Sequence, residues 1–308
     1  QMKEIGASVE GSPFAGEFRT NSPAWTWTEA FGYTVAGIPV LDSGLYGSDH
    51  TGSYHSSSDT AEANNYSPEV FQYGHKLYGS FVLAFDQLAV RDFDFTALFE
   101  AMSGTVDESV IENAAGLQAA LDGAGEAASL LSAKNREMAE AGDTAQFNKD
   151  MNDLFRTVSN ELFSINWNEE FRFVHQYKQD NVAALRGAIA CLEAGDVAGA
   201  LDDYLWMVDL NWYAYSFNKE TCDFFVDQVL GEDARNSWGA GYLTTHADLW
   251  EVIQSLMGKA GQEGADVSGE LEVLRAELAV QQADLNAVVG EEIVTLQKLT
   301  KVMEALAK

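Results

Sequence analysis

The chain has 308 residues, enough for about two domains of typical size and a substantial core. Its 48 acidic and 18 basic residues give a net charge of −30, which repels phosphate backbones and argues against nucleic acid as a partner. Hydrophobic residues make up 46% of the chain, too many for a disordered acidic tail. No apolar run is long enough for a membrane-spanning helix, so we expect a folded, acid-coated protein without a membrane span.

The prolines separate two parts of the chain. All four, Pro13, Pro23, Pro39 and Pro68, lie in the first 68 residues. Proline breaks helices, so this distribution predicts an irregular or α/β leader followed by a helical body. We place the boundary between the domains at residue 92, giving domains of residues 1–92 and 93–308.

Three segments can be predicted in the leader. The apolar, β-prone run 33–41 ends at a turn-forming sequence and predicts a buried strand. Residues 46–65 are rich in Gly, Ser, Asp and His and predict a loop. Ser67 as N-cap, Pro68 in the first turn and apolar residues at helical spacing predict a helix over 68–90.

The remainder of the chain has helical patterns almost throughout. Asp94 is a suitable N-cap for a helix over 95–102. Further helices are predicted at 109–141, 144–163, 170–194, 197–209, 212–230, 245–258 and 268–306. The last segment carries a long apolar stripe that fits either a coiled-coil seam or the wall of a bundle, and we favour the bundle. The expected fold is therefore mostly α, a small α/β part followed by an all-helical, bundle-like domain.

The loop after the predicted strand is the first candidate site. It contains His50 and His55 together with Asp49 and Asp59. Imidazole and carboxylate groups in a loop that follows a buried strand are common metal ligands. The alternative is a solvated polar loop without function, because neither His-x-His nor His-Glu-x-x-His occurs.

Other candidate residues are better explained by structure. We expect His75 to be a structural residue of its helix, and His175 and His246 have no neighbours in a metal-binding pattern. Cys191 and Cys222 have no adjacent His or basic residue that would lower the thiol pKa. An aromatic cluster could line a pocket, but we expect it to be core; it comprises Tyr204, Trp206, Trp212, Tyr213, Tyr215 and Phe217.

Two segments carry a family resemblance. Ala36–Asp42 (AGIPVLD), followed by Tyr54–Thr60 (YHSSSDT), resembles the late catalytic-domain signature of co-catalytic two-zinc exopeptidases. These are the aminopeptidases and the enzymes similar to glutamate carboxypeptidase II, and the transferrin receptor is their non-enzymatic relative. Weaker similarity continues downstream, in Ser67–Pro68 with Phe71–His75, in Arg91–Phe95 and in Asn152–Phe163.

The resemblance implies roles for individual residues. His55 would be a zinc ligand, and the hydroxyl of Tyr54 would donate to the tetrahedral intermediate. Asp59 would orient the loop, and Asp49 and His50 are secondary candidates. Two zinc ions would polarise the peptide carbonyl of the substrate and bind the attacking hydroxide. The family also uses its helical domain for dimerisation, so the resemblance implies a homodimer, for which 268–306 is the suspected surface.

The resemblance is incomplete. The family's other zinc ligands precede the Gly-Ile-Pro segment, and the residues before it here contain neither His nor Glu-Glu. A single imidazole cannot hold a catalytic zinc, so the chain is expected to be the C-terminal part of such an enzyme and inactive by itself. Gln72-Tyr73 lacks the cation with which glutamate carboxypeptidases bind a terminal carboxylate, which favours an aminopeptidase-like parent, exported or in the cell envelope. The alternative is a non-enzymatic helical binding or assembly module of the transferrin-receptor-like branch.

Overall fold

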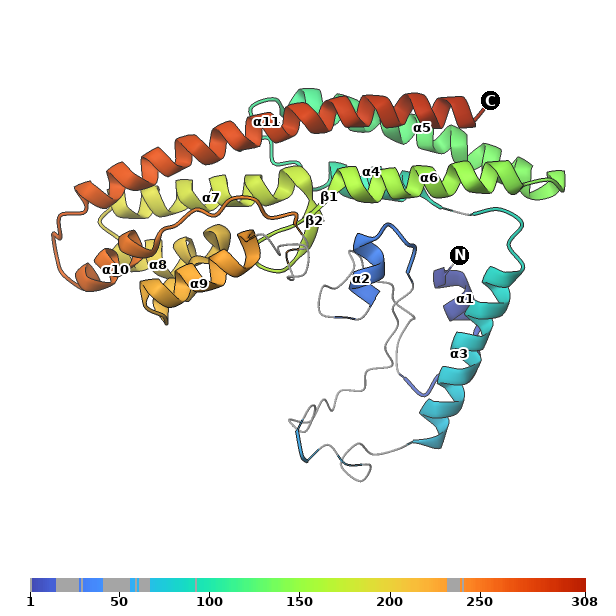
Figure 1. Cartoon of the computed structure of the whole chain (residues 1–308), viewed down its shortest axis with the longest axis horizontal. Coiled ribbons are helices and arrows are strands. Elements are labelled where there is room, and N and C mark those ends of the chain that lie inside the picture. Colours follow the sequence, from blue (N-terminus) through green and yellow to red (C-terminus); the bar gives the residue numbers. More distant parts are fainter. Residues whose placement is uncertain are drawn as a thin grey trace.

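The protein is mostly helical, as the sequence predicts (Figure 1). A computed structural model describes residues 2–14, 28, 30–40, 56–58, 60, 67–91, 93–231, 239 and 241–308. Within these residues, the chain forms a long helical body, which is preceded in sequence by an arm of helices (Figure 1).

The longest helix, α11 (Ser268–Leu306), runs along the whole helical body (Figure 1). Its C-terminal half packs on α5 (Ala114–Ala141) and α6 (Ala145–Leu162), and its N-terminal half packs on α7 (Val174–Glu193). The apolar stripe of α11 is therefore the wall of a bundle, and the interpretation favoured from sequence is confirmed.

The first half of the body has one large core. It is built by α5, α6, the C-terminal half of α11 and α4 (Phe95–Ser103). Asp94 caps α4 by accepting hydrogen bonds from the backbone N–H groups of Thr96 and Ala97, as predicted. Small buried residues of α5, among them Ala124 and Ala128, allow its neighbours to approach closely.

The second half of the body has a core of its own. It is formed by α7, the N-terminal half of α11, α8 (Val197–Asp203), η1 (Leu205–Tyr215) and α10 (Trp250–Lys259). Helix α9 (Lys219–Leu230) packs on η1 and contributes to a smaller cluster around Trp167. Leu278 of α11 contacts both large cores and joins them.

A two-stranded antiparallel sheet connects the halves, and it replaces the last residue of the helix predicted at 144–163 and the first residues of the helix predicted at 170–194. Strands β1 (Phe163–Ile165) and β2 (Phe171–Phe173) pair Phe163 with Phe173 and Ile165 with Phe171. The intervening turn places Glu169 at φ 60°, in the left-handed region. Stacked rings of Phe163 and Phe171, with centroids 4.9 Å apart, stabilise the pairing. The aromatic and β-branched residues that flank this turn favour strand over an extension of either helix.

The strand predicted over 33–41 is wrong in its described part. Residues Ala30–Val35 form helix α2, and the chain continues as a turn and irregular structure to residue 40. Gly37 ends the helix at φ 67°, where its N–H bonds to the carbonyl of Thr34 and the N–H of Ile38 bonds to that of Tyr33. This is a Schellman C-cap, which only glycine forms without strain. The Gly-Ile-Pro segment thus follows a helix.

The arm contains α1 (Met2–Ser8) and α3 (Pro68–Asp86). Ser67 caps α3 through the N–H of Val70, as predicted, with Pro68 in the first turn. Tyr73, Leu77 and Phe81 of α3 pack against the first residues of the chain and form a cluster distinct from the other cores. The domain boundary at residue 92 remains a prediction.

Among the described helices, none combines the length and the apolar character needed to cross a membrane.

Candidate functional site

The predicted zinc-site residues cannot be located. Asp49, His50, Tyr54, His55 and Asp59 all lie outside the described residues. In the described part of the chain, no group of three or more His, Cys, Asp or Glu side chains is arranged to hold a metal ion. The zinc site and its assignments therefore remain predictions.

A different site is found where the sequence predicts the end of one helix and the start of another. Within η1 the backbone leaves helical geometry at Val208, and Asp209 and Leu210 adopt φ of 43° and 59°. Consecutive non-glycine residues in the left-handed region store strain, which proteins retain mostly at functional positions. The kink lies at the predicted break between the helices 197–209 and 212–230, but η1 spans this break and α9 begins only at Lys219.

Asp209 is held at this kink by three hydrogen bonds. Its side chain accepts from the hydroxyl of Tyr177 at 2.6 Å, from Nδ2 of Asn181 at 2.7 Å and from the backbone N–H of Ala247 at 2.8 Å. The residue is 1% exposed, and no lysine or arginine among the described residues forms an ion pair with it. Burial, together with the charge of Asp209, raises the pKa of Tyr177, so the phenol stays a donor. Three donors directed at one side chain match an ionised carboxylate.

Asn211 and His246 fix the segment 245–249, which precedes α10, against the kink. Asn211 donates to the carbonyl of Ala247 at 2.7 Å and accepts from the N–H of Leu249 at 3.0 Å. His246 Nε2 lies 2.9 Å from the backbone oxygen of Asp209, so this nitrogen carries the proton and donates. Because Asp209 and Asn211 capture these backbone groups, residues 245–249 are not helical and α10 begins at Trp250, later than predicted.

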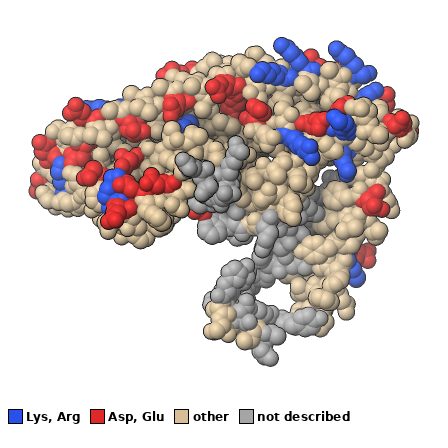
Figure 2. All heavy atoms as spheres, in the orientation of Figure 1, with Lys and Arg blue, Asp and Glu red and all other residues tan. Residues whose placement is uncertain are grey.

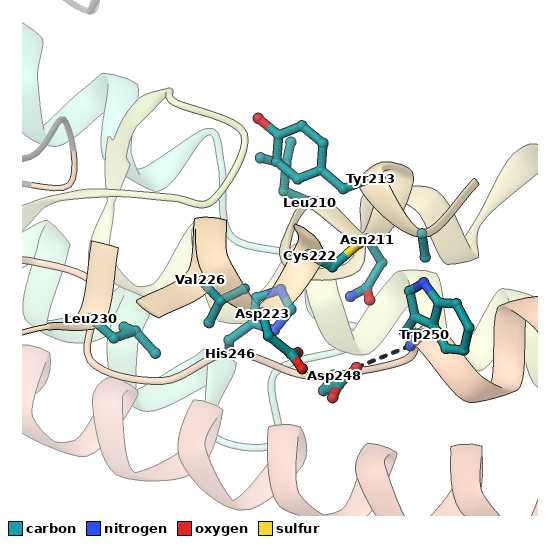
Figure 3. A pocket seen from close by; sticks show the side chains of 11 residues that line it. Leu210, Asn211, Tyr213, Cys222, Asp223, Val226, Leu230, His246, Asp248 and Trp250 are labelled. Carbon is teal, nitrogen blue, oxygen red and sulfur yellow. Dashed lines mark hydrogen bonds between the residues drawn. The ribbon is translucent and has the colours of Figure 1, made fainter. Parts of the chain in front are cut away.

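Two neighbouring cavities with shared lining residues lie between η1, α9 and the segment before α10, and together they are called the pocket, each cavity being one lobe. Each lobe has a volume of about 170 Å³. Leu210, Tyr213, Val226 and His246 line both lobes. The first lobe adds polar groups, among them Cys222, Asp223 and Asp248, beside Trp250 (Figure 3). The second adds Trp167, Phe225 and the buried Asp209.

Charge is unevenly distributed around this pocket. Lys219, at the start of α9, forms ion pairs with Asp223 and, at 2.8 Å, with Asp248. The hydrogen bond to Asp223 raises the pKa of Lys219, and the ammonium remains charged. Burial lowers the pKa of His246, so its imidazole is neutral at neutral pH. Asp223 and Asp248 thus share one ammonium, and Asp209 adds a third carboxylate that has no lysine or arginine partner among the described residues.

The reactive groups of the pocket favour binding over nucleophilic chemistry. Burial raises the pKa of the Cys222 thiol, which therefore stays protonated and unreactive near neutral pH. His246 uses one ring nitrogen to hold the kink. The aromatic walls, by contrast, are preformed: Tyr213 and Phe225 stack with ring centroids 5.2 Å apart, and the Nε1 of Trp167 donates to the carbonyl of Thr245.

The two remaining histidines of the described residues, His75 and His175, both have hydrogen-bond partners, and His75 is exposed on α3. Its Nδ1 lies 2.9 Å from the carbonyl oxygen of Phe71, one turn earlier in α3. His175 is completely buried, with Nδ1 3.0 Å from Glu292 and Nε2 3.1 Å from the hydroxyl of Thr105. These contacts link α7 to α11 and to the end of α4.

The pocket was not predicted from the sequence because the aromatic cluster within residues 204–217 was expected to be core. Trp206, Trp212 and Phe217 are each about two-fifths exposed, so that interpretation is wrong for them, and Tyr213 lines the pocket. The available signal was Asp209 and Asn211, two polar residues inside the otherwise apolar run 205–214. Polar residues in such a run are buried and must be satisfied, and here they shape the backbone.

Comparison of the chain with protein-family models, with curated proteins and with solved structures gives no match.

Proposed function

We propose that the helical body is a non-enzymatic binding module that holds a small ligand in the pocket between η1, α9 and the segment before α10. This corresponds to the alternative function expected from sequence, a helical binding module. The observation that carries the proposal is the strained kink at Asp209 and Leu210, which both line the second lobe. Strain of this kind is retained where function requires it, and here it shapes a preformed cavity.

The chemistry of the pocket supports binding. Its walls are mostly apolar and aromatic with few polar groups, the usual composition of a small-molecule site. Each lobe is comparable to an engineered cavity of about 150 Å³ that accommodates benzene. Cys222 is kept protonated and His246 neutral, so the pocket lacks an activated nucleophile.

A blocked pocket tests the proposal. Val226 is half-buried and lines both lobes, so the larger side chain of Val226→Phe would reduce the volume of each. Val294→Phe is the matched control, because Val294 is 48% exposed on α11, away from the pocket. Both variants are compared with the original chain by thermal unfolding in the presence of small organic compounds that include neutral, cationic and anionic members.

A bound ligand stabilises the folded state, by about 2.7 kcal/mol at one hundred times its dissociation constant. We expect at least one compound to raise the unfolding temperature of the original chain and of Val294→Phe but not of Val226→Phe. If none does, or if the shift persists in Val226→Phe, the proposed function is wrong.

The resemblance of residues 54–60 to the two-zinc exopeptidases supports a second proposal, that this chain supplies one ligand, His55, and part of the pocket of a peptidase. Elemental analysis after zinc loading, with His55→Ala as the comparison, tests it. Stoichiometric zinc that is lost in the variant supports a site in the loop that includes His55. Zinc absent from both chains fits a chain that supplies only one ligand, whereas stoichiometric zinc retained by His55→Ala would contradict the assignment of His55.

A further inference from the structure

We infer that the ligand of this pocket is a small organic cation, of the size and chemistry of a quaternary ammonium ion. The inference rests on the proposed binding function and adds the chemical class of the ligand. It depends on three features of the pocket: its excess of negative charge, its aromatic walls and the position of Lys219.

The charge balance favours a cation. Asp209 lines the second lobe without a cationic partner among the described residues, and Asp223 and Asp248 of the first lobe share the single ammonium of Lys219. The surrounding segment strengthens this bias, since residues 196–259 contain eleven acidic and three basic residues. Acidic side chains predominate over this end of the body, whereas Lys and Arg gather toward the opposite end (Figure 2). A cation entering the pocket is therefore attracted at long and short range.

The aromatic rings provide the second feature. Trp167, Tyr213 and Phe225 line the lobe that also contains Asp209. Faces of such rings attract organic cations, and tryptophan does so most strongly. Quaternary ammonium groups bind well to aromatic walls because their charge is diffuse and the group is weakly hydrated. An anionic ligand would instead meet buried Asp209, which makes an anion unfavourable.

Lys219 provides the third feature, because its ammonium already lies between two carboxylates of the first lobe. Lys219 itself does not line either lobe, so it compensates these carboxylates from outside the pocket. Removing its charge should strengthen binding of a cation and leave binding of a neutral molecule unchanged.

The inference can be tested with two molecules of the same shape. Choline carries a trimethylammonium group, and 3,3-dimethyl-1-butanol has a carbon atom in place of the charged nitrogen. Isothermal titration calorimetry at low salt measures both. We expect choline to bind about tenfold more tightly, since aromatic and carboxylate contacts together favour the charged group. Its affinity should fall as salt is added.

Charge variants localise the effect. Asp223→Asn should weaken choline binding about fivefold, and Lys219→Gln should strengthen it about fivefold, as expected for one partly solvated charge. Asp227→Asn is the matched control, because Asp227 is exposed on the same helix and does not line the pocket. It removes the same charge from the surface and should leave the affinity unchanged within about twofold.

The outcomes separate the two proposals. Tighter binding of choline, with opposite effects of the two pocket variants, supports a cation site. Equal binding of both molecules, blocked by Val226→Phe, overturns the inference and leaves the binding function intact. If neither molecule binds, the inference is overturned, and the unfolding measurements with the wider set of compounds decide the proposed function separately.

Discussion

Replacement of Asp209 tests whether the kink is held by side-chain hydrogen bonds against backbone strain. Asp209→Ala removes the acceptor of three donors, of which Tyr177 and Asn181 are side chains and Ala247 contributes its backbone N–H. A buried donor without a partner costs about 1–3 kcal/mol, so we expect a loss of at least about 3 kcal/mol in the free energy of unfolding. Alanine at φ 43° adds about 1 kcal/mol of strain.

Two further variants separate these contributions. Asp209→Gly loses the same hydrogen bonds but tolerates the left-handed backbone, so it should be about 1 kcal/mol more stable than Asp209→Ala. Asp209→Asn keeps the shape of the side chain and one acceptor oxygen. Of the three variants it should lose the least free energy of unfolding, about 1–3 kcal/mol. Urea unfolding monitored by tryptophan fluorescence measures the order of stability of the three variants. If Asp209→Ala is as stable as Asp209→Gly, the left-handed backbone is not strained. If Asp209→Asn has the same free energy of unfolding as Asp209→Ala, the side-chain hydrogen bonds do not hold the kink.

Three more predictions concern the helical body. Because burial lowers the pKa of His246, the unfolded state binds the proton first as pH falls. The stability of the folded state should therefore decrease below about pH 6.5. The thermal unfolding temperature should fall less over this range in His246→Gln. Gly187→Ala should lower the free energy of unfolding in urea by about 1–3 kcal/mol, since an added Cβ would meet the ring of Tyr204. Gly290→Ala, with open space around it, should raise this free energy by about 0.5–1 kcal/mol. A higher free energy of unfolding in both variants would contradict the packing at Gly187. Arg275→Ala, which removes an exposed ion pair of 2.6 Å with Glu193, should change stability by less than about 1 kcal/mol, and a larger loss would show that this pair matters more than its exposure suggests.

The helices were predictable where local signals agree. Ser67 and Asp94 cap α3 and α4 because each supplies a side-chain acceptor at the correct position before an apolar-periodic segment. The apolar stripe of α11 also predicted its place in a bundle, since its 3.6-residue period extends over the whole segment. In these cases local preference and tertiary packing favour the same structure.

The predictions from sequence are wrong where a tertiary contact determines the local backbone structure. The β-branched residues near Tyr33 favour a strand, but the chain takes the helix that the C-cap at Gly37 completes, and Gly37 packs against Arg156. The kink at Asp209 depends on Ala247, which is 38 residues away in sequence. Periodicity carries no information about such a partner, so the pocket could not be derived from it.

The place of α11 in the chain bears on how the protein is made. This helix follows every other described element in sequence, yet it supplies Leu285 and Leu296 to one core and Leu274 to the other. Neither core can close before α11 has left the ribosome, so the preceding helices have exposed apolar faces until then. The many acidic side chains repel neighbouring chains during this interval. The charge of the protein thus protects the unfinished chain from aggregation before it shapes the surface of the finished one.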